Sequence, residues 1–416
     1  MNPIKNRFLI DSRKIVILGA GKIGRSFIGQ LFGKGGYKVV FIDIDPVIVG
    51  RLNDQGTYKV ITKGEKDEEI IVRNVRAISA FNTRESAEAV ATAGILAVAV
   101  GKNAIEKVIP VIASGLELRY VQNPDSPLDI IIAENMIAAG DFMKERLVKY
   151  LPFDYPFEKL VGLVETSIGK MVPIMTTSDL EKDPLMVYAE PYNTLILDRK
   201  AFKSPVPEIE GLAPKDNIKA WVDCKAFIHN LGHATAAYYG FYRHREAVFM
   251  YEVLDDSEVF RFTREVMLQS AAILKDAYYQ DFTTNKLEEH IDDLLSRFRN
   301  KALRDTIFRV GHDLTRKLGC DDRFAGAIHL AVKFNNPYNK ILKAMSYGLF
   351  FKAKDNNGNS FPPDIAFLNE LSKEFKVTLT NCLLLDPDAD RIIIEELKNL
   401  YKALYYDAKS FCSDPQ

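Results

Sequence analysis

The chain has 416 residues, of which 47% are hydrophobic and 27% are charged, and 55 basic and 56 acidic side chains give a net charge of −1. This length exceeds what one hydrophobic core usually covers, so two domains are expected. The balanced charge argues against a nucleic-acid partner. No run approaches the roughly eighteen apolar residues of a membrane-spanning helix, and the first residues lack the apolar segment of a signal peptide. We therefore expect a globular cytoplasmic protein without a membrane partner.

The cysteines are scattered along the chain, at Cys224, Cys320, Cys382 and Cys412. They form no CxxC pair and no spacing typical of metal ligands. Disulfides are rare in the cytosol, so reduced thiols are expected. The pattern predicts a protein that uses no metal.

The N-terminal half alternates short apolar runs with helical patterns. The predicted strands cover 14–19, 37–45, 95–100 and 128–135, and the predicted helices include 23–32 and 105–116. Fully apolar strands that alternate with helices are typical of a parallel sheet covered on both faces. This half is predicted to be an α/β domain of the Rossmann type.

The segment 202–217 is rich in proline and glycine, and the pattern after it is helical almost throughout. Such segments commonly separate domains. We expect a dinucleotide-binding domain over residues 1–206 and a mainly α-helical domain that binds the substrate over residues 207–416.

The motif GAGKIG follows the first predicted strand and begins the first predicted helix. In this context the first glycine permits a tight turn, the second lets the backbone approach a pyrophosphate, and the third allows close packing of helix and strand. The helix N-terminus supplies hydrogen-bond donors and a favourable dipole for phosphates. The motif predicts a cofactor site at Gly19, Gly21, Lys22, Ile23 and Gly24.

Asp43 lies at the end of the second predicted strand. A carboxylate there accepts hydrogen bonds from ribose hydroxyls and repels a 2′-phosphate, so NAD is expected rather than NADP. The alternative is a glycine turn followed by an ordinary strand-end carboxylate, which the joint spacing disfavours. Val100 and Gly101 follow the next apolar strand and are expected, from topology alone, on the nicotinamide side.

The segment KAFIHNLGH (225–233) opens the helical half. On an ideal α-helix Lys225, His229, His233 and Asn230 fall at about 0°, 40°, 80° and 140°, on one arc of the surface. Taken alone, the segment fits an amphipathic helix whose polar residues face solvent at least as well as it fits a reactive site. His229 fits that structural interpretation best.

The chain resembles the long-chain polyol dehydrogenases, and among them most closely the enzymes that act on mannitol 1-phosphate. The resemblance extends from the first strand to about Arg323 and rests on KIVILGAGKIGRSFIGQL, SPLDIIIAENM (126–136), DPLMVYAEP (183–191), Lys-x4-Asn-x2-His from Lys225, and RFRN…RVGHDLTRKLGCDDR (297–323). No site is expected after Arg323, where the resemblance is weakest.

The resemblance implies a role for each residue of this group. Lys225 would be the general base in alcohol oxidation and the acid in ketone reduction, which requires a pKa below the usual lysine value of about 10.4. Asn230 and Asn135 would donate hydrogen bonds to the oxygen that becomes alkoxide-like, without a metal. His233 would orient the lysine or the substrate.

The basic run near the end of the resemblance is implied to bind the substrate, through Arg309, Arg316, Lys317 and Arg323. Guanidinium groups bind phosphate oxygens bidentately, and a lysine adds a point charge. The alternative is a solvated basic helix face whose charge is offset by Asp313, Asp321 and Asp322.

Three departures from the family pattern affect the substrate pocket. The usual Val-Asp-Arg is Ile168-Gly169-Lys170 here, and two expected prolines are replaced by Lys301 and Leu314. The missing aspartate removes a partner for a substrate hydroxyl or for Lys170.

The predicted function is NAD-dependent hydride transfer to or from a secondary alcohol of a linear polyol phosphate, with mannitol 1-phosphate and fructose 6-phosphate as the favoured pair. One alternative is an enzyme for a related polyol or a hexuronate of the tagaturonate or fructuronate type. Another is an NAD-sensing binding protein without turnover. The expected partner is a small molecule, and the chain is expected to be a monomer or a small homo-oligomer.

Overall fold

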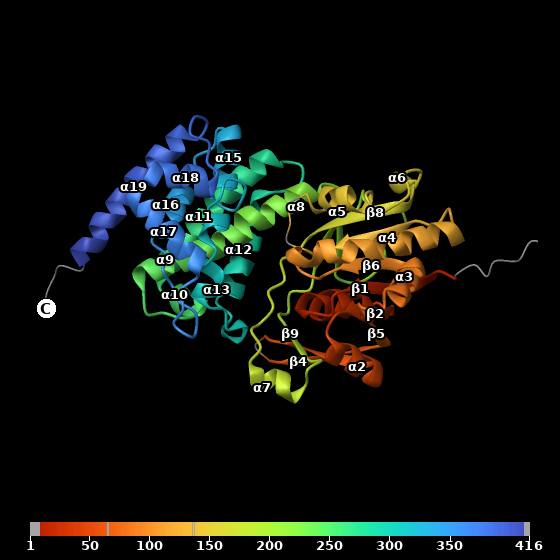
Figure 1. The fold of residues 1–416 in the computed structure, drawn as a ribbon. Helices are drawn as coiled ribbons and strands as arrows, with labels where there is room; N and C mark the ends of the chain where they lie inside the picture. Colours follow the sequence, from red (N-terminus) through yellow and green to blue (C-terminus); the bar gives the residue numbers. More distant parts are fainter. Residues whose placement is uncertain (1–8, 65, 135, 137, 412–416) are drawn as a thin grey trace, which may run out of the picture. The chain divides into compact units, whose positions relative to one another are not determined.

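The computed structural model describes residues 9–64, 66–134, 136 and 138–411. The chain forms two compact units, Met1–Val222 and Asp223–Gln416 (Figure 1). The division falls inside α8 (Ile218–Cys224), later than the 206/207 boundary expected from composition. The reason is that the chain beyond residue 207 still contributes a strand, β11, to the sheet of the first unit.

The first unit is built on an eight-stranded sheet in the order β11-β10-β8-β7-β6-β1-β2-β5. Neighbouring strands from β5 to β8 are parallel, whereas β10 is antiparallel to β8 and parallel to β11. The strands are β1 (Asp11–Leu18), β2 (Lys38–Asp43), β5 (Val75–Ser79), β6 (Ala93–Val98), β7 (Leu128–Ile132), β8 (Val161–Ser167), β10 (Leu195–Asp198) and β11 (Leu212–Lys215).

A smaller sheet of order β4-β3-β9 and several helices complete this unit. The small sheet contains β3 (Thr57–Thr62), β4 (Glu68–Arg73) and β9 (Val187–Ala189). The helical segments are η1 (Gly24–Gly29), α1 (Gln30–Lys34), α2 (Pro46–Gln55), α3 (Thr83–Ala91), η2 (Lys102–Ala104), α4 (Ile105–Gln122), α5 (Ala139–Leu147), α6 (Phe157–Leu160), α7 (Thr177–Lys182) and α8.

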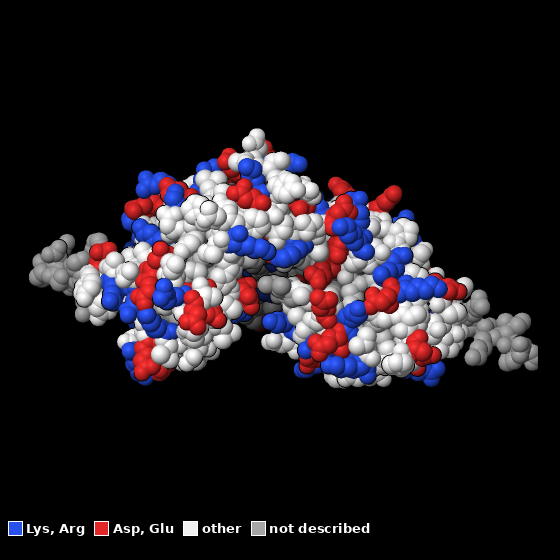
Figure 2. All heavy atoms as spheres, turned by 90° about the horizontal axis from the view of Figure 1, so that it is seen from above, with Lys and Arg blue, Asp and Glu red and all other residues white. Residues whose placement is uncertain are grey.

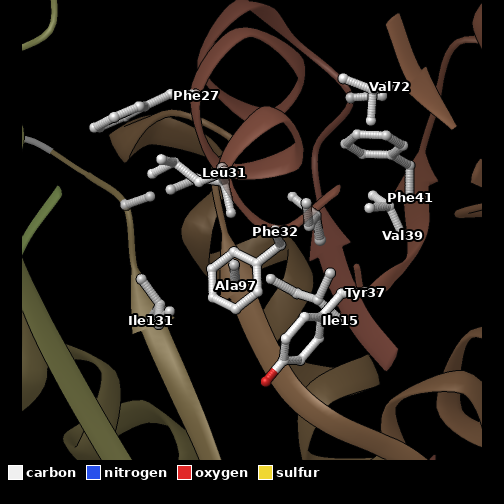
Figure 3. Packing of buried hydrophobic residues seen from close by; sticks show 14 of the residues in the cluster. Ile15, Phe27, Leu31, Phe32, Tyr37, Val39, Phe41, Val72, Ala97 and Ile131 are labelled. Carbon is white, nitrogen blue, oxygen red and sulfur yellow. The ribbon is translucent and has the colours of Figure 1, made fainter. Parts of the chain in front are cut away.

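The two faces of the main sheet are buried under different layers. Ile15 and Ile17 of β1 join a cluster with Phe27, Phe32 and the small sheet, part of which Figure 3 shows. Val16 and Leu18, which alternate with them, join a second cluster with residues of α3, α4 and α5. Successive side chains of a strand point to opposite faces, so a strand covered on both faces reads as a continuous apolar run.

The second unit is helical and is organised around α9 (Leu231–Arg243), which is buried from Leu231 to Phe241. A Cβ at Gly232 would lie 2.4 Å from Met267 Sδ of α11, so this glycine permits close packing of the two helices. The other elements are η3 (Lys225–Asn230), α10 (Met250–Leu254), α11 (Ser257–Ala277), α12 (Thr284–Phe298), η4 (Lys301–Leu303), α13 (Ile307–Gly311), α14 (Leu314–Lys317), α15 (Ala325–Lys333), α16 (Asn339–Gly348), α17 (Pro362–Lys373), α18 (Phe375–Leu383) and α19 (Arg391–Phe411).

The predicted fold class, a Rossmann-type α/β domain followed by a mainly helical one, is confirmed. Within the part of the chain that the structure describes, no helix combines the length and the apolar character needed to cross a bilayer. Basic and acidic side chains are interspersed over both units on the face drawn in Figure 2.

Candidate active site

The glycine-rich loop is tightly packed at two of its glycines and open at the third. Gly19 has φ +98°, and a Cβ there would lie 2.4 Å from the carbonyl oxygen of Ala99. A Cβ at Gly24 would lie 2.0 Å from the carbonyl oxygen of Gly19. A Cβ at Gly21, in contrast, would meet no atom within 4 Å. Two glycines are therefore needed for packing, and the third leaves open space where the backbone can meet a ligand.

Asp43 ends β2 beside this loop. Its Oδ2 accepts a hydrogen bond of 2.5 Å from the N–H of Ala20, and its Oδ1 accepts one of 2.9 Å from the N–H of Asp45. The carboxylate is thus oriented by the loop itself, and each oxygen keeps a further lone pair for a ribose hydroxyl.

Arg25, which follows the glycine-rich loop, is a residue that sequence reasoning missed. It lies in the π-helical turn η1, its side chain is only 6% exposed, and its Nε donates to the carbonyl of Ala20 at 2.7 Å. Its Nη1 donates to the carbonyls of Pro184 and Leu185. Because the guanidinium reaches two loops at once, it connects the cofactor turn to the segment before β9; only its position after GAGKIG could have signalled this.

The carboxyl ends of β6 and β7 are joined by a second unpredicted residue. The buried Glu134 accepts a hydrogen bond of 2.6 Å from the N–H of Gly101, whose φ is +86°. Burial raises the pKa of Glu134, and the Gly101 and Val100 amides oppose that rise. Val100 and Gly101 therefore lie at the carboxyl edge of the sheet, just after β6, and their place beside the nicotinamide stays a prediction. Asn135 lies outside the residues that the structure describes.

The lysine segment is not an ideal α-helix. Residues Lys225–Asn230 form the π-helical turn η3, in which Leu231 N–H donates to the carbonyl of Ala226, five residues earlier. The hydroxyl of Ser270 in α11 donates to the carbonyl of Phe227 at 2.6 Å. The angles expected for an ideal α-helix are therefore wrong across this turn. Single π turns inside α-helices are frequent at functional sites.

Lys225 begins this π turn and is partly buried. Desolvation by the surrounding protein and, to a smaller extent, the charge of Arg323 lower the pKa of Lys225 to about 7, against the opposing charge of Asp322. A lysine with such a pKa is neutral in a large fraction of molecules near neutral pH, which is the condition for proton transfer in both directions.

The two histidines of the segment pack on one aromatic ring. The ring of His233 stacks on Phe298 with centroids 4.3 Å apart and an interplanar angle of 6°, and His229 meets the same ring edgewise at 5.4 Å. Burial lowers the pKa of both histidines, so both are neutral at pH 7. His229 does not face solvent; it belongs to the packed interior.

Arg309 and His233 lie beside a shared carboxylate that sequence reasoning missed. The buried Asp305 accepts hydrogen bonds from Nε and Nη2 of Arg309, and its Oδ2 lies 3.3 Å from Nε2 of His233. Asp305 precedes Arg309 by four residues, and this spacing is the one signal that could have identified it.

The other predicted substrate residues form a second cluster. Asp322 contacts both Arg316 and Arg323, at 3.2 and 2.8 Å. Arg323 also donates to the carbonyl of Asn230, the last residue of the π turn, at 3.3 Å. Lys317 is 5% exposed and donates to the carbonyl of Val310 at 2.6 Å. Burial, together with Arg323, Arg316 and Arg309, lowers the pKa of Lys317 to about 7, against the opposing charge of Asp313.

The departing Gly169-Lys170 pair follows β8 in the first unit. Lys170 is buried, donates to Oδ1 of Asn193 at 2.8 Å and lies 5.1 Å from the centroid of the Phe27 ring. Glu190, also buried, accepts from the N–H of Met171. This lysine is thus integrated into the packing around the loop.

Each unit gathers one part of the predicted site. The first brings the glycine loop, Asp43, Val100 and Gly101 to the carboxyl edge of its sheet. The second gathers the lysine segment and the basic cluster around η3. Among the described residues, no group of three or more His, Cys, Asp or Glu side chains could hold a metal ion.

Comparison with known families gives two matches that cover most of the chain. A model of the mannitol dehydrogenase Rossmann domain matches residues 13–211, and a model of the mannitol dehydrogenase C-terminal domain matches residues 217–381. The chain belongs to the mannitol dehydrogenase family. It is therefore a polyol dehydrogenase that uses a nicotinamide cofactor. The C-terminal match also extends beyond Arg323, where the resemblance was expected to fade.

One solved structure shows the same fold, and two others match with lower TM-scores. The substrate-free structure of a D-sorbitol dehydrogenase covers 96% of this chain and 94% of its own length with a TM-score of 0.76 at 15% identity. A D-mandelate dehydrogenase in complex with NADH and anilino(oxo)acetate covers 80% of this chain and 96% of its own length, with a TM-score of 0.46 at 15% identity. An octopine dehydrogenase covers 83% and 92%, with a TM-score of 0.48 at 11% identity.

Proposed function

We propose that this polyol dehydrogenase transfers hydride between NAD and a secondary alcohol of a linear polyol phosphate, with Lys225 as the acid–base residue and without a metal. The favoured pair is mannitol 1-phosphate and fructose 6-phosphate. The observation that supports this most directly is the position of Lys225 on a π turn next to a cluster of buried and half-buried cations.

NAD fits the residues of the first unit. The open space above Gly21 accommodates a pyrophosphate, and the oriented carboxylate of Asp43 suits two ribose hydroxyls while repelling a 2′-phosphate. When bound, the cofactor supplies the hydride acceptor for alcohol oxidation and the hydride donor for ketone reduction.

The proton is assigned to Lys225. In the oxidation direction its neutral amine takes the hydroxyl proton as the carbon loses hydride, and in reduction the ammonium returns a proton to the carbonyl oxygen. Asn230, five residues further along the π turn, is suited to donate an amide hydrogen bond to that oxygen, which carries negative charge in the transition state. We assign the same role to Asn135 on the basis of the family resemblance alone.

The phosphate is assigned to Arg309, Arg316, Lys317 and Arg323. Their carboxylate partners, such as Asp322, hold the guanidinium groups in place and offset part of their charge. Guanidinium and phosphate form bidentate, charge-assisted hydrogen bonds, so a prearranged cluster favours a phosphorylated substrate over a free polyol.

A panel of free and phosphorylated polyols, ketoses and hexuronates, each with NAD and NADP, tests the proposal through NADH absorbance. We expect the fastest turnover with mannitol 1-phosphate and fructose 6-phosphate. A preference for tagaturonate or fructuronate would instead support the hexuronate alternative, because guanidinium groups pair with carboxylates as well. NAD binding without turnover of any compound would support the sensor alternative.

Replacing Arg316 or Lys317 with alanine tests phosphate recognition. We expect kcat/KM for mannitol 1-phosphate to fall by about 10- to 100-fold, since hydrogen bonds to charged groups contribute about 1.5–3 kcal/mol. The value for free mannitol should change little. Lys333→Ala, an exposed lysine of α15, is the control. An equal loss with both substrates would contradict the phosphate assignment.

A further inference from the structure

The backbone around Asp305 is fixed by hydrogen bonds of its own, which do not involve its side chain. It lies between η4 and α13, and its carbonyl accepts a hydrogen bond of 2.9 Å from the N–H of Met250 at the start of α10. The next residues are fixed as well, because Thr306 forms an isolated bridge with Phe249 and Ile307 N–H donates to the carbonyl of Val248. The Cα of Asp305 is therefore fixed, and the residue is only 6% exposed.

The carboxylate of Asp305 is ionised and faces two groups on two different helices. Burial raises the pKa of Asp305, but the contacts with His233 of α9 and Arg309 of α13 outweigh burial and hold it well below its usual range. Arg309, with half of its side chain exposed, uses two of its nitrogens on this one carboxylate. A bidentate pair of this kind fixes the direction of the guanidinium plane.

Asp305 lies beside one nitrogen of the His233 ring and can set which of the two ring nitrogens carries the proton. Stacking on Phe298 fixes the plane of the imidazole but not which nitrogen points in which direction. Nε2 is buried from solvent and lies 3.3 Å from Oδ2 of Asp305, at an angle outside hydrogen-bond geometry. A carboxylate at Nε2 favours the tautomer protonated there and leaves the lone pair on Nδ1.

We propose that Asp305 is a positioning residue that orients His233 and Arg309 together, so that one carboxylate links the proton-transfer segment to the substrate-binding arginine. This inference rests on the proposed function for its kinetic consequence, but its structural part concerns only these three side chains. Through His233, Asp305 influences turnover, and through Arg309 it influences substrate affinity.

The tautomer of His233 tests the structural part without any substrate. In full-length protein labelled with ¹⁵N-histidine, we expect the ¹⁵N spectrum of His233, assigned with His233→Gln, to show the Nε2-protonated form. In Asp305→Asn, whose amide retains the shape of the side chain, we expect that preference to be lost. An unchanged tautomer in Asp305→Asn would overturn the proposal.

Kinetics with the best substrate of the panel tests the second part. By analogy with carboxylates that hold metal-ligating histidines, whose removal costs about 10- to 100-fold in activity, Asp305→Asn should lower kcat by a similar factor. It should also raise KM. The two effects should separate in double mutants: Asp305→Asn should add little to kcat in His233→Gln and little to KM in Arg309→Ala. Fully additive effects in both backgrounds would overturn the proposal.

Asp292→Asn is the matched control, because it removes a carboxylate that pairs with Arg264 on an exposed surface. We expect wild-type kinetics from it. Thermal unfolding and NAD affinity, measured on Asp305→Asn, identify a merely structural role: a large fall in Tm with kcat and KM unchanged at 25 °C would contradict positioning. If wild-type protein turns over no compound of the panel, the proposed function fails, whereas the tautomer comparison still decides the contact of Asp305 with His233.

Discussion

Two π-helical turns of this protein, η1 and η3, have the same kind of support but different residues at their ends. In each, a hydroxyl from a neighbouring element donates to a carbonyl of the turn: Tyr58 of β3 to Arg25 at 2.8 Å, and Ser270 of α11 to Phe227 at 2.6 Å. A π turn interrupts the regular α-helical hydrogen bonds, so carbonyls there need other donors.

The difference lies in what each turn presents. The first begins and ends with glycine, at Gly24 and Gly29, where a Cβ would lie closest to the carbonyl oxygen of Gly19 and to the hydroxyl of Tyr58. The second begins with Lys225 and ends with Asn230. In the first turn, glycine lets the backbone approach other backbone closely. In the second, the π geometry changes the relative positions of Lys225 and Asn230, to which we assign the proton transfer and the stabilisation of the substrate oxygen. The comparison predicts that damage to η1 affects cofactor binding, whereas damage to η3 affects turnover.

The largest effect is expected from Lys225→Ala. Loss of a general acid–base group costs about 10²- to 10⁴-fold in kcat, whereas NAD affinity, measured by fluorescence titration, should be nearly unchanged. Lys219→Ala, an exposed lysine on the preceding helix α8, is the control and should behave like wild type. Turnover that survives in Lys225→Ala would remove this lysine from the mechanism.

If Lys225 is the acid–base residue, the rates of oxidation and reduction should change with pH in opposite directions. The pKa of Lys225 is lowered to about 7, and oxidation needs its neutral form, so kcat/KM for the alcohol should fall as the pH decreases below about 7 and level off above it. Reduction needs the ammonium form and should decrease as the pH rises above about 7. A rate of oxidation that increases up to pH 10 would indicate an ordinary lysine pKa.

Asp43→Ala is expected to have the next largest effect, and only on the cofactor. The loss of hydrogen bonds to a charged group, about 1.5–3 kcal/mol, should weaken NAD binding by about 10- to 100-fold. Use of NADP should improve, because the repulsion of a 2′-phosphate is removed. Asp43→Asn separates the two terms, since it loses the charge but keeps an acceptor for the N–H of Ala20. Unchanged selectivity in both variants would contradict the assignment of Asp43.

Gly21→Ala and Gly19→Ala change different properties of the same loop. The first should affect cofactor binding, and the second should affect the stability of the fold. A Cβ at Gly21 meets no protein atom, so Tm should be unchanged while NAD affinity falls by about tenfold, or 1.4 kcal/mol. Gly19→Ala, with φ +98° and a close carbonyl, should lower the free energy of unfolding by more than about 1 kcal/mol. Equal NAD affinity in Gly21→Ala and wild type would show that the cofactor does not approach this loop.

The smallest effects test the comparison most directly. Tyr58→Phe and Ser270→Ala each remove one hydroxyl from a π turn, which should cost about 1 kcal/mol of stability. The kinetic consequences should differ: Tyr58→Phe should raise the Kd for NAD a few-fold, and Ser270→Ala should lower kcat a few-fold. If both variants change the same parameter, the two turns do not have separate roles.

The sequence by itself determined the fold class and the elements that carry the site. Short apolar runs followed by turns predicted β1, β2, β6 and β7, because a strand that is buried on both faces of a parallel sheet has apolar residues at nearly every position. The spacing of Gly19, Gly21, Gly24 and Asp43 predicted a tight turn, close helix–strand packing and a strand-end carboxylate, and the structure has these features. The binding of a cofactor there stays a prediction. The roles of Lys225, Asn230 and His233 followed from resemblance and stay a proposal.

Only the tertiary structure decided how those residues are supported. The π turns depend on Tyr58 and Ser270, each more than thirty residues from the carbonyl it binds, and no local pattern encodes such a contact. The pKa of Lys225 and the identity of Asp305 and Glu134 as organising carboxylates depend on burial and on distances between segments. Helical and strand periodicity report which face of an element is apolar. They do not report which charge lies 3 Å away, because that is fixed only when the helices pack.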